Sequence, residues 1–457
     1  MVWFADRLGA DTRCRSTGHN HSVKPAQSGR LGRGDSLHAI SVLLVLRRIV
    51  LITILIMPQR FWLGRGWRLI ALLRRPSWRT TGYVFLIAAA IAMVLVLSDR
   101  IFRKFLPGPV SFWIAPIVQL WVFTSTFAFI CVSAVHAIEW SWSKLTRARA
   151  GAGDSVAKDP SRRYFFRYAA SFTGALPFVG GIYGYARERL RFEVVRVKVH
   201  IPNLAAGLNG FRIVQLSDIH IGDFMPREEI RRAVEEANSL APDLAVITGD
   251  FLTSRGDPLA ECIEELSLLK ASLGVWGCNG NHEIYAGAED AAEELFRIYG
   301  MTLLRQRAAQ LEWKGESLNL IGVDYQHEVQ LTGSMLPTLG GVESLVRQGM
   351  LNILLSHNPN TFYSAAGLGI GLTLAGHTHG GQINLGIGSH SWNPARFMTA
   401  FVAGLYQLPI ARTAGPSSAA GNHQAFLYVN RGLGTLGVPA RLGAAPEITL
   451  LTLQPAL

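Results

Sequence analysis

The sequence predicts an α/β domain that follows an α-helical transmembrane region. Three observations predict this arrangement. Long uncharged apolar runs lie before position 190, and from position 200 onward short apolar runs alternate with charged stretches of helical periodicity. Polar side chains of metal-binding type stand where several of the short runs stop. We therefore divide the chain into a tail (1–57), a membrane region (58–190) and a C-terminal domain (200–457).

The tail is basic and has no regular pattern over its first forty residues, so we expect disorder there. Residues 41–57 are apolar except for Arg47 and Arg48 at their centre. Each such charge costs about 2.5–3.5 kcal/mol at the middle of a transmembrane helix. An interfacial helix is therefore at least as favoured as a span in this segment.

The membrane region contains three predicted spans. Residues 81–97 and 112–138 are uncharged and, with their flanks, long enough to cross a bilayer, which takes about 20 residues. Residues 168–186 are apolar but contain several glycines and Pro177, so they form either a third span or a buried approach to the domain.

Basic residues predict the orientation of these spans. Residues 58–80 hold six arginines and residues 141–167 hold a second basic cluster, so the positive-inside rule puts both in the cytoplasm. A third crossing would then deliver the C-terminal domain to the extracytoplasmic side of an inner (plasma) membrane. The motif SRRYFFR at 161–167 resembles an internal twin-arginine export signal, although paired arginines are also ordinary topology determinants.

The net charge also differs between the N-terminal region and the C-terminal domain. The chain has 44 Lys+Arg and 32 Asp+Glu, of which residues 200–457 contribute 15 basic and 23 acidic side chains. The positive charge belongs to the N-terminal region, which indicates a membrane partner and argues against a nucleic-acid surface on the domain.

Within the C-terminal domain, five short apolar runs predict strands: FRIVQLS, DLAVITG, GVWGCN, LNILLS and LTLA. Amphipathic stretches at 226–240, 257–273 and 288–299 predict crossover helices between them. Residues 385–422, rich in glycine, proline and aromatic side chains, interrupt this pattern and are the candidate substrate loop.

A set of polar motifs follows the predicted strands. They are SDIHIG, TGD, GNHE, SHNP and GHTHGGQ, and they offer seven candidate metal ligands and one further histidine. Strand ends of an open α/β sheet meet at one edge, so loops distant in sequence converge there. Oxygen and imidazole ligands without cysteine suit manganese, iron or zinc and argue against a closed structural zinc site.

The order DxH, GD, GNH(D/E), H, GHxH resembles the calcineurin-like metallophosphoesterases over residues 201–453. RGLG at 431–434 and PEI at 446–448 resemble their membrane-associated bacterial branch. The resemblance implies a four-layer α-β-β-α sandwich with a pair of divalent ions at the strand ends. It implies Asp218, His220 and His379 as ligands of one ion, Asn281, His357 and His377 as ligands of the other, and Asp250 as the bridge.

The resemblance also implies catalytic roles. Asp250 and His282 are the predicted catalytic residues; His282 faces the phosphate as hydrogen-bond donor or general acid, and Asn281 also touches the substrate. Thr253 stands where many relatives carry an aspartate that orients this histidine, and Glu283 replaces a commoner aspartate. Glu283 and Asp257 are the alternative orienting partners.

Two arginines complete the predicted site. Arg431 and Arg441 either bind the substrate phosphate or form structural salt bridges.

The sequence thus predicts a membrane-anchored phosphoesterase that acts on phosphomonoester, phosphodiester or pyrophosphate bonds of small or lipid-linked phosphorylated molecules, with no nucleic-acid partner. A phosphoprotein phosphatase with an open groove and a non-catalytic metal-binding scaffold are the alternatives.

Overall fold

A computed structural model of the chain describes residues 53, 55–102, 108–149, 160–222, 224–326, 339–387, 390–409 and 424–456. The tail predicted to be disordered, and most of the predicted interfacial helix, lie outside these residues. The described residues form two compact units, one of residues up to 102 and 125–174, the other of residues 108–124 and 175–456.

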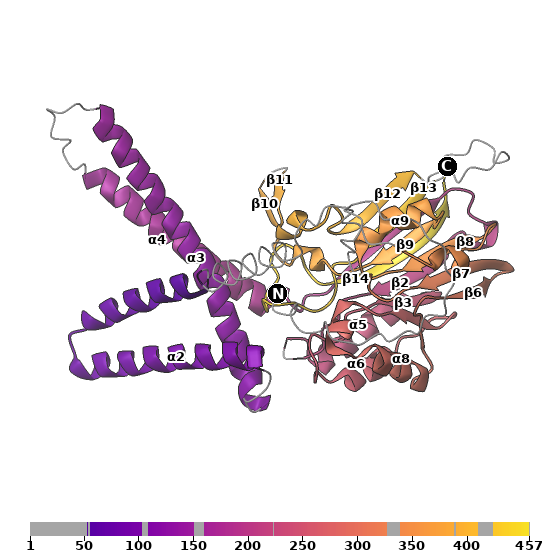
Figure 1. Ribbon diagram of the computed structural model, residues 1–457, viewed down its shortest axis with the longest axis horizontal. Coiled ribbons are helices and arrows are strands. Elements are labelled where there is room, and N and C mark those ends of the chain that lie inside the picture. Colours follow the sequence, from indigo (N-terminus) through magenta and orange to yellow (C-terminus); the bar gives the residue numbers. More distant parts are fainter. Residues whose placement is uncertain are drawn as a thin grey trace, which may run out of the picture. The chain divides into compact units, whose positions relative to one another are not determined.

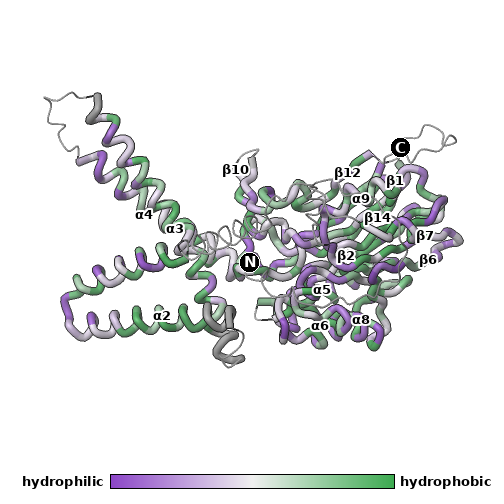
Figure 2. The backbone as a smooth tube through the Cα atoms, in the orientation of Figure 1, coloured by the Kyte–Doolittle hydropathy of each residue, from purple (hydrophilic) through white to green (hydrophobic). Residues whose placement is uncertain are grey.

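The N-terminal half is helical (Figure 1). A helix over residues 55–71 is followed by α2 (Pro76–Phe102), α3 (Gly108–Arg149) and α4 (Pro160–Tyr183). Among the described residues, two stretches are long and apolar enough to cross a membrane: Pro76–Val96 in α2 and Ile114–Thr146 in α3. Figure 2 shows the apolar residues along α2. The third predicted span falls largely within α4 and stays a prediction.

Most of the basic segment 58–80 is helical. Its helix is fixed through Ser125 of α3, whose hydroxyl accepts a 3.0 Å hydrogen bond from Gln59 and whose carbonyl accepts a 2.9 Å bond from Trp62. Three of the six arginines of this segment therefore lie on this helix, and a fourth, Arg79, lies on α2.

Two six-stranded mixed sheets form the C-terminal domain (Figure 1). The first has the order β1-β14-β2-β3-β4-β5 and the second the order β12-β13-β9-β8-β7-β6. Their strands are β1 (Glu193–Ile201), β2 (Arg212–Leu216), β3 (Leu244–Thr248), β4 (Val275–Cys278), β5 (Thr302–Leu303), β6 (Arg307–Trp313), β7 (Glu316–Gly322), β8 (Leu351–Leu355), β9 (Leu372–Ala375), β12 (Gly404–Pro409), β13 (Gln424–Val429) and β14 (Glu447–Pro455).

The two sheets pack face to face. One apolar core joins Ile213 of the first sheet to Leu320 and Leu374 of the second. The neighbouring side chain, Val214, points the other way and packs against helices, because successive side chains of a strand alternate between its faces. This alternation places one core between the sheets and another under the helices.

Helices cover the outer faces of both sheets. The first sheet carries α5 (Arg227–Ser239), α6 (Leu259–Leu266) and α8 (Glu289–Ile298), at the predicted crossover positions, and the second carries α9 (Phe362–Gly367). The predicted four-layer α-β-β-α sandwich is therefore confirmed. Its first strand, β1, begins at Glu193, ahead of the predicted domain boundary at position 200.

The predicted substrate loop is only partly a loop. Its described residues form a short hairpin of β10 (Leu385–Ile387) and β11 (His390–Trp392), which stands apart from the two large sheets (Figure 1), and a 3₁₀ turn, η7 (Pro394–Phe397). β12 then joins the second sheet at its edge, pairing antiparallel with β13. The candidate substrate loop therefore includes a strand, whose side chains alternate between half-buried and exposed; its role with the substrate stays a prediction.

Candidate metal centre

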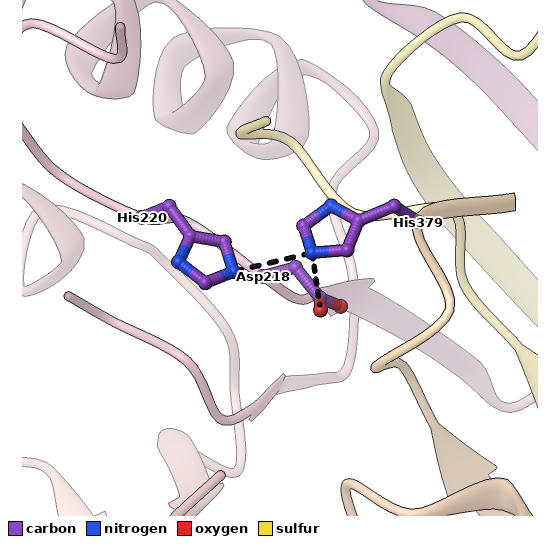
Figure 3. A group of neighbouring side chains, drawn as sticks. All are labelled: Asp218, His220 and His379. Atoms are coloured by element: carbon purple, nitrogen blue, oxygen red, sulfur yellow. Dashed lines mark hydrogen bonds and ion pairs between the residues drawn. The ribbon is translucent and has the colours of Figure 1, made fainter. Parts of the chain in front are cut away.

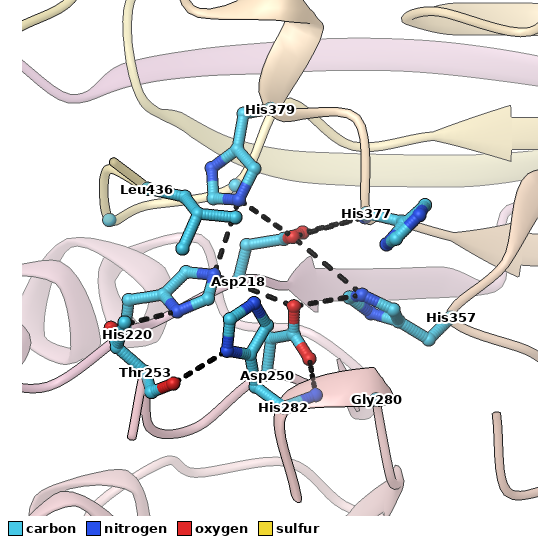
Figure 4. Close-up of polar contacts among 12 residues, drawn as sticks. Asp218, His220, Asp250, Thr253, Gly280, His282, His357, His377, His379 and Leu436 are labelled. Carbon is cyan, nitrogen blue, oxygen red and sulfur yellow. Dashed lines mark hydrogen bonds and ion pairs between the residues drawn. The ribbon is translucent and has the colours of Figure 1, made fainter. Parts of the chain in front are cut away.

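Every predicted ligand stands just beyond the end of a strand. Asp218 follows β2, Asp250 follows β3, His357 follows β8, and His377 and His379 follow β9. Their side chains meet between the edges of the two sheets (Figure 4). The sandwich thus gathers ligands that are up to about 160 residues apart in sequence, as expected for strand ends of an α/β fold.

One cluster consists of Asp218, His220 and His379 (Figure 3). The Nε2 atoms of the two imidazoles lie 3.2 Å apart, and Nε2 of His379 lies 3.3 Å from Oδ1 of Asp218. Two ligands of one ion, each about 2.1 Å from it, are separated by about 3.0–3.4 Å in tetrahedral or octahedral geometry. The observed separations match the edges of one coordination shell.

A second cluster consists of Asp250, His357 and His377. Oδ2 of Asp250 lies 3.1 Å from Nε2 of His357 and 3.5 Å from Nε2 of His220, which belongs to the first cluster. Oδ1 of Asp250 is fixed by a 2.9 Å hydrogen bond from the N–H of His282. The Asp250 carboxylate therefore lies between the two clusters.

Buried atoms of Asn281 and His357 also fit metal ligation. Oδ1 of Asn281 is buried and has no hydrogen-bond partner among the described residues. Nδ1 of His357 lies 2.6 Å from the carbonyl oxygen of Thr248, so Nε2 is the nitrogen that faces the cluster, 3.1 Å from the Asp250 carboxylate. A buried acceptor without a donor is costly in a folded protein, and a bound cation removes that cost.

Burial and mutual charge shift the pKa values of the cluster. Burial lowers the pKa of His220 and of His377 to about 3, so both imidazoles are neutral at pH 7, the form that binds metal. Burial, with the Asp250 charge nearby, raises the pKa of Asp218 to about 6. Burial also acts to lower the pKa of His357, but the carboxylates of Asp250 and Asp218 outweigh it and raise the value to about 10. The site attracts positive charge.

The ligands are held in an unusual backbone conformation. Asp218, His220, Asp250, His377 and His379 all have positive φ, which side-chain-bearing residues adopt rarely and at a cost. Such strained residues concentrate at functional sites, where the surrounding structure holds them in place. The positive φ values are therefore a further sign that this region is built for function.

The glycines of GNH and GHTH allow close approach to the carboxylates. A Cβ atom on Gly280 would lie 2.1 Å from Oδ1 of Asp250, and one on Gly376 would lie 2.3 Å from Oδ2 of Asp218. Neither position accommodates a side chain without displacing a predicted ligand.

His282 has a main-chain orienting partner. Its Nδ1 lies 2.6 Å from the carbonyl oxygen of Thr253, an arrangement in which Nδ1–H donates and Nε2 is left for the centre (Figure 4). The Thr253 hydroxyl lies 3.1 Å from Nδ1 of His220. The residue that replaces the usual aspartate thus contacts both histidines, one through its carbonyl and one through its hydroxyl.

Both predicted alternatives, Glu283 and Asp257, accept hydrogen bonds from the main chain. The buried Glu283 carboxylate accepts hydrogen bonds from the N–H groups of Asp250 (2.9 Å), Phe251 (2.8 Å) and Gly280 (2.7 Å). Asp257 accepts from the N–H groups of Thr253 (3.0 Å) and the next residue. Both carboxylates therefore shape the loop after β3, and through it they position the ligands.

Both arginines are engaged within the fold, Arg431 in the predicted kind of salt bridge and Arg441 in main-chain hydrogen bonds instead. Arg441 is fully buried and donates to main-chain carbonyls, including those of Gly432 (3.0 Å) and Ala444 (3.0 Å). Arg431 forms ion pairs with Glu447 and with Glu193, the latter at 3.0 Å. Their donors are engaged within the fold, so neither guanidinium is positioned as a free phosphate clamp.

Two residues near the centre have no predicted role. Gln382, the last residue of GHTHGGQ, pairs its side chain with both main-chain polar groups of Leu436, which lies beside His379 (Figure 4). The ring of Tyr325 lies 5.3 Å from that of His377. Gln382 could have been found from the sequence because it belongs to the GHTHGGQ motif. Tyr325 follows β7 and belongs to no recognisable motif.

Comparisons with known proteins agree with this geometry. Residues 211–381 match the family model "Calcineurin-like phosphoesterase". The chain is 31% identical to the uncharacterized metallophosphoesterase YkuE of Bacillus subtilis over 304 residues, which are 65% of this chain and 99% of that protein.

Two other relatives carry more specific names. A transmembrane protein with metallophosphoesterase domain from Danio rerio is 30% identical over 60% of this chain, and the match spans only 60% of that relative's own length. The UDP-2,3-diacylglucosamine pyrophosphatase LpxG of Chlamydia trachomatis is 27% identical over 61% of this chain and 94% of its own length.

The sandwich, the clustered aspartates and histidines at its strand ends and the match along nearly the whole of YkuE lead to one conclusion: the chain belongs to the calcineurin-like metallophosphoesterase family.

Proposed function

We propose that this phosphoesterase binds two divalent ions and hydrolyses phosphate ester or pyrophosphate bonds of lipid-linked substrates at a membrane. The ions, of manganese, iron or zinc, would be held by Asp218, His220, Asp250, Asn281, His357, His377 and His379. Two such ions supply Lewis-acid chemistry: they lower the pKa of water and neutralise charge on the phosphate.

The position of Asp250 is the single observation that carries the proposal. Its carboxylate lies 3.1 Å from a nitrogen of one cluster and 3.5 Å from a nitrogen of the other. A carboxylate between two cation sites offsets the repulsion between the ions, which are about 3.5–4 Å apart in two-metal enzymes. Asp250 therefore serves as the bridge in this proposal.

His282 is the proposed proton donor to the leaving oxygen. The Thr253 carbonyl, 2.6 Å from Nδ1, fixes the ring so that Nε2 is directed to the centre. A positioned donor of this kind contributes typically about 10²- to 10⁴-fold to the rate. Loss of His282 would slow turnover of substrates with poor leaving groups most, because these depend on protonation.

A lipid-linked substrate is supported by two observations. The LpxG relative is named for a diacylated sugar nucleotide, and its match spans 94% of that protein. The chain also contains two helices of membrane-spanning length and composition. A domain held beside a bilayer meets lipid head groups at high local concentration, which favours them as substrates.

The proposal places the catalytic domain on the extracytoplasmic side of the inner (plasma) membrane. Its support is the excess of arginine in segments 58–80 and 141–167, which the positive-inside rule keeps in the cytoplasm. Labelling of the intact cell surface with an impermeant lysine reagent distinguishes the two sides. Label on Lys270 or Lys314 in intact cells is expected, and label only after lysis contradicts this orientation.

The activity test uses the purified full-length chain with manganese, iron or zinc. Its substrates are an aryl phosphate monoester, an aryl phosphate diester and a lipid pyrophosphate. We expect metal-dependent hydrolysis that the Asp250→Asn substitution lowers by at least about 10³-fold. Undiminished activity of the Asp250→Asn variant contradicts the bridging role. A metal-loaded chain that hydrolyses none of the three substrates favours the non-catalytic scaffold.

A further inference from the structure

An unusual group of exposed apolar side chains lies on the segment that follows the metal motif GHTHGGQ. Phe397 and Met398 are 83% and 72% exposed, more than any other large hydrophobic side chain described in residues 190–456. Leu385 and Trp392 are directly paired across the β10–β11 hairpin and are also exposed. We call these four residues the apolar patch.

The apolar patch is built on the metal-binding loop. The side chain of Asn393 donates a 2.8 Å hydrogen bond to the carbonyl of Gly380, the residue after His379, and its oxygen accepts from the N–H of Ala395. Thr399, at the other end of η7, donates to Asn360 at 2.7 Å. The turn that presents Phe397 is thus fixed on both sides. The folded structure itself therefore holds the Phe397 side chain in an exposed position.

The start of α3 and the end of α4 belong to the same compact unit as the catalytic domain. Within one compact unit, Trp121 of α3 packs on Phe178 of α4 at a ring distance of 5.5 Å. Trp121 belongs to Ile114–Thr146, one of the two stretches that qualify as membrane spans. The start of that span and the end of α4 therefore lie together.

The end of α4 leads to the apolar patch through one short segment, residues 441–443. Gly184, directly after α4, approaches the carbonyl of Arg441 so closely that a Cβ atom would lie 2.4 Å from it. The next residue, Leu442, accepts a 2.8 Å hydrogen bond from the N–H of Asn384, which precedes β10. The helix end, this segment and the patch-bearing hairpin therefore follow one another within a few residues.

We propose that the apolar patch inserts into the bilayer that holds the helices, so that the metal centre works on phosphate groups presented at the lipid surface. Exposed aromatic side chains flanked by a basic residue are typical of the membrane interface. Arg396, which is exposed, supplies the charge. A bilayer explains both the exposure and the position of the patch.

This inference deepens the proposed function and rests on it for the substrate. The full-length chain is reconstituted in phosphatidylcholine nanodiscs that contain a diacyl lipid pyrophosphate, and an aryl phosphate diester is supplied in solution. In the Phe397→Glu/Met398→Glu variant, we expect the ratio of lipid to aryl ester hydrolysis to fall at least tenfold. The matched control is Ile298→Glu, which changes a 59% exposed apolar residue of α8 and leaves the ratio unchanged.

An unchanged ratio in the double variant overturns the proposal, and so does an equal loss on both substrates, which would show that the patch stabilises the domain instead.

A second measurement does not depend on enzymatic activity. Phosphatidylcholine with a diazirine on its acyl chain is photolysed in the same nanodiscs, and labelled peptides are mapped. Label on residues 392–398 is expected; label on α2 and α3 without any on this segment overturns insertion, even if both substrates are hydrolysed.

Discussion

At the scale of single residues, the centre depends on side chains that contact the ligands without binding metal. Thr253 is the clearest example, because its hydroxyl lies 3.1 Å from His220 and its carbonyl 2.6 Å from His282. The sequence identified Thr253 as a departure from the family pattern but not this double contact. A main-chain carbonyl leaves no side-chain signature, so only the folded loop reveals it.

We predict that Thr253→Val weakens metal binding and spares the chemical step. The substitution removes the hydroxyl beside His220 and keeps the carbonyl that orients His282. Loss of such an outer partner typically costs about 10- to 100-fold in metal affinity. Metal titration of activity should therefore require about tenfold more manganese, while kcat at saturation changes by less than about threefold. Thr253→Ser should behave as wild type; equal affinity in the valine variant contradicts the role.

Metal affinity should rise with pH. In the metal-free chain, the carboxylates of Asp250 and Asp218 outweigh burial and raise the pKa of His357 to about 10, and burial raises the pKa of Asp218 to about 6. Both must be deprotonated to bind metal, so protons compete with the ion. Between pH 6 and pH 10 the affinity should increase about tenfold per pH unit, and below pH 6 more steeply.

Calorimetry in buffers of different ionisation enthalpy measures this competition directly. At pH 8 we expect manganese binding to release about one proton per chain. Binding without proton release, or an affinity independent of pH, contradicts the assignment of His357 as a ligand.

At the scale of elements, the strand ends and the loops after them make the site. The apolar runs predicted β2, β3, β4, β8 and β9, and with them the position of every ligand. The pairing of β1 with β14 could not be predicted, because it joins the two ends of the domain and no local pattern encodes such a contact. The burial of Arg441 among main-chain carbonyls could not be predicted either, because the sequence suggested only a phosphate or a carboxylate as its partner.

The loop after β3 should depend on Glu283. Its carboxylate accepts from three N–H groups within 2.9 Å, and a glutamine offers only one acceptor oxygen to them. Each buried N–H left unpaired costs about 1–3 kcal/mol. Burial, with the nearby Asp250 charge, raises the pKa of Glu283 to about 7, so the comparison belongs at pH 8, where the group is ionised.

We predict that Glu283→Gln lowers the melting temperature of the full-length chain in EDTA by about 5 °C or more. The control is Glu294→Gln on α8, where the ion pair with Arg297 is exposed and screened by solvent, so the melting temperature should change by less than about 1 °C. Equal melting temperatures for both variants would show that the Glu283 hydrogen bonds are dispensable.

At the scale of the whole molecule, two long apolar helices precede a four-layer sandwich whose metal-binding edge adjoins an exposed apolar patch. Composition predicted the division between membrane region and domain, because charge and hydropathy differ over long stretches. For the region of the patch, the sequence predicted only that residues 385–422 interrupt the alternation of strands and helices. Which of its side chains are exposed depends on the hairpin and turn that present them, and part of that interruption became β12.

The number of metal ions per chain tests the central claim most directly. The full-length protein is loaded with manganese, freed of excess metal and measured by elemental analysis beside its Asp250→Asn and His282→Ala variants. We expect two ions in the wild type, two in His282→Ala, and fewer than about one in Asp250→Asn, because the Asp250 carboxylate lies between the two clusters and would bridge both ions. A wild type that retains no more than one ion, or an Asp250→Asn variant that retains two, would contradict a paired-ion centre.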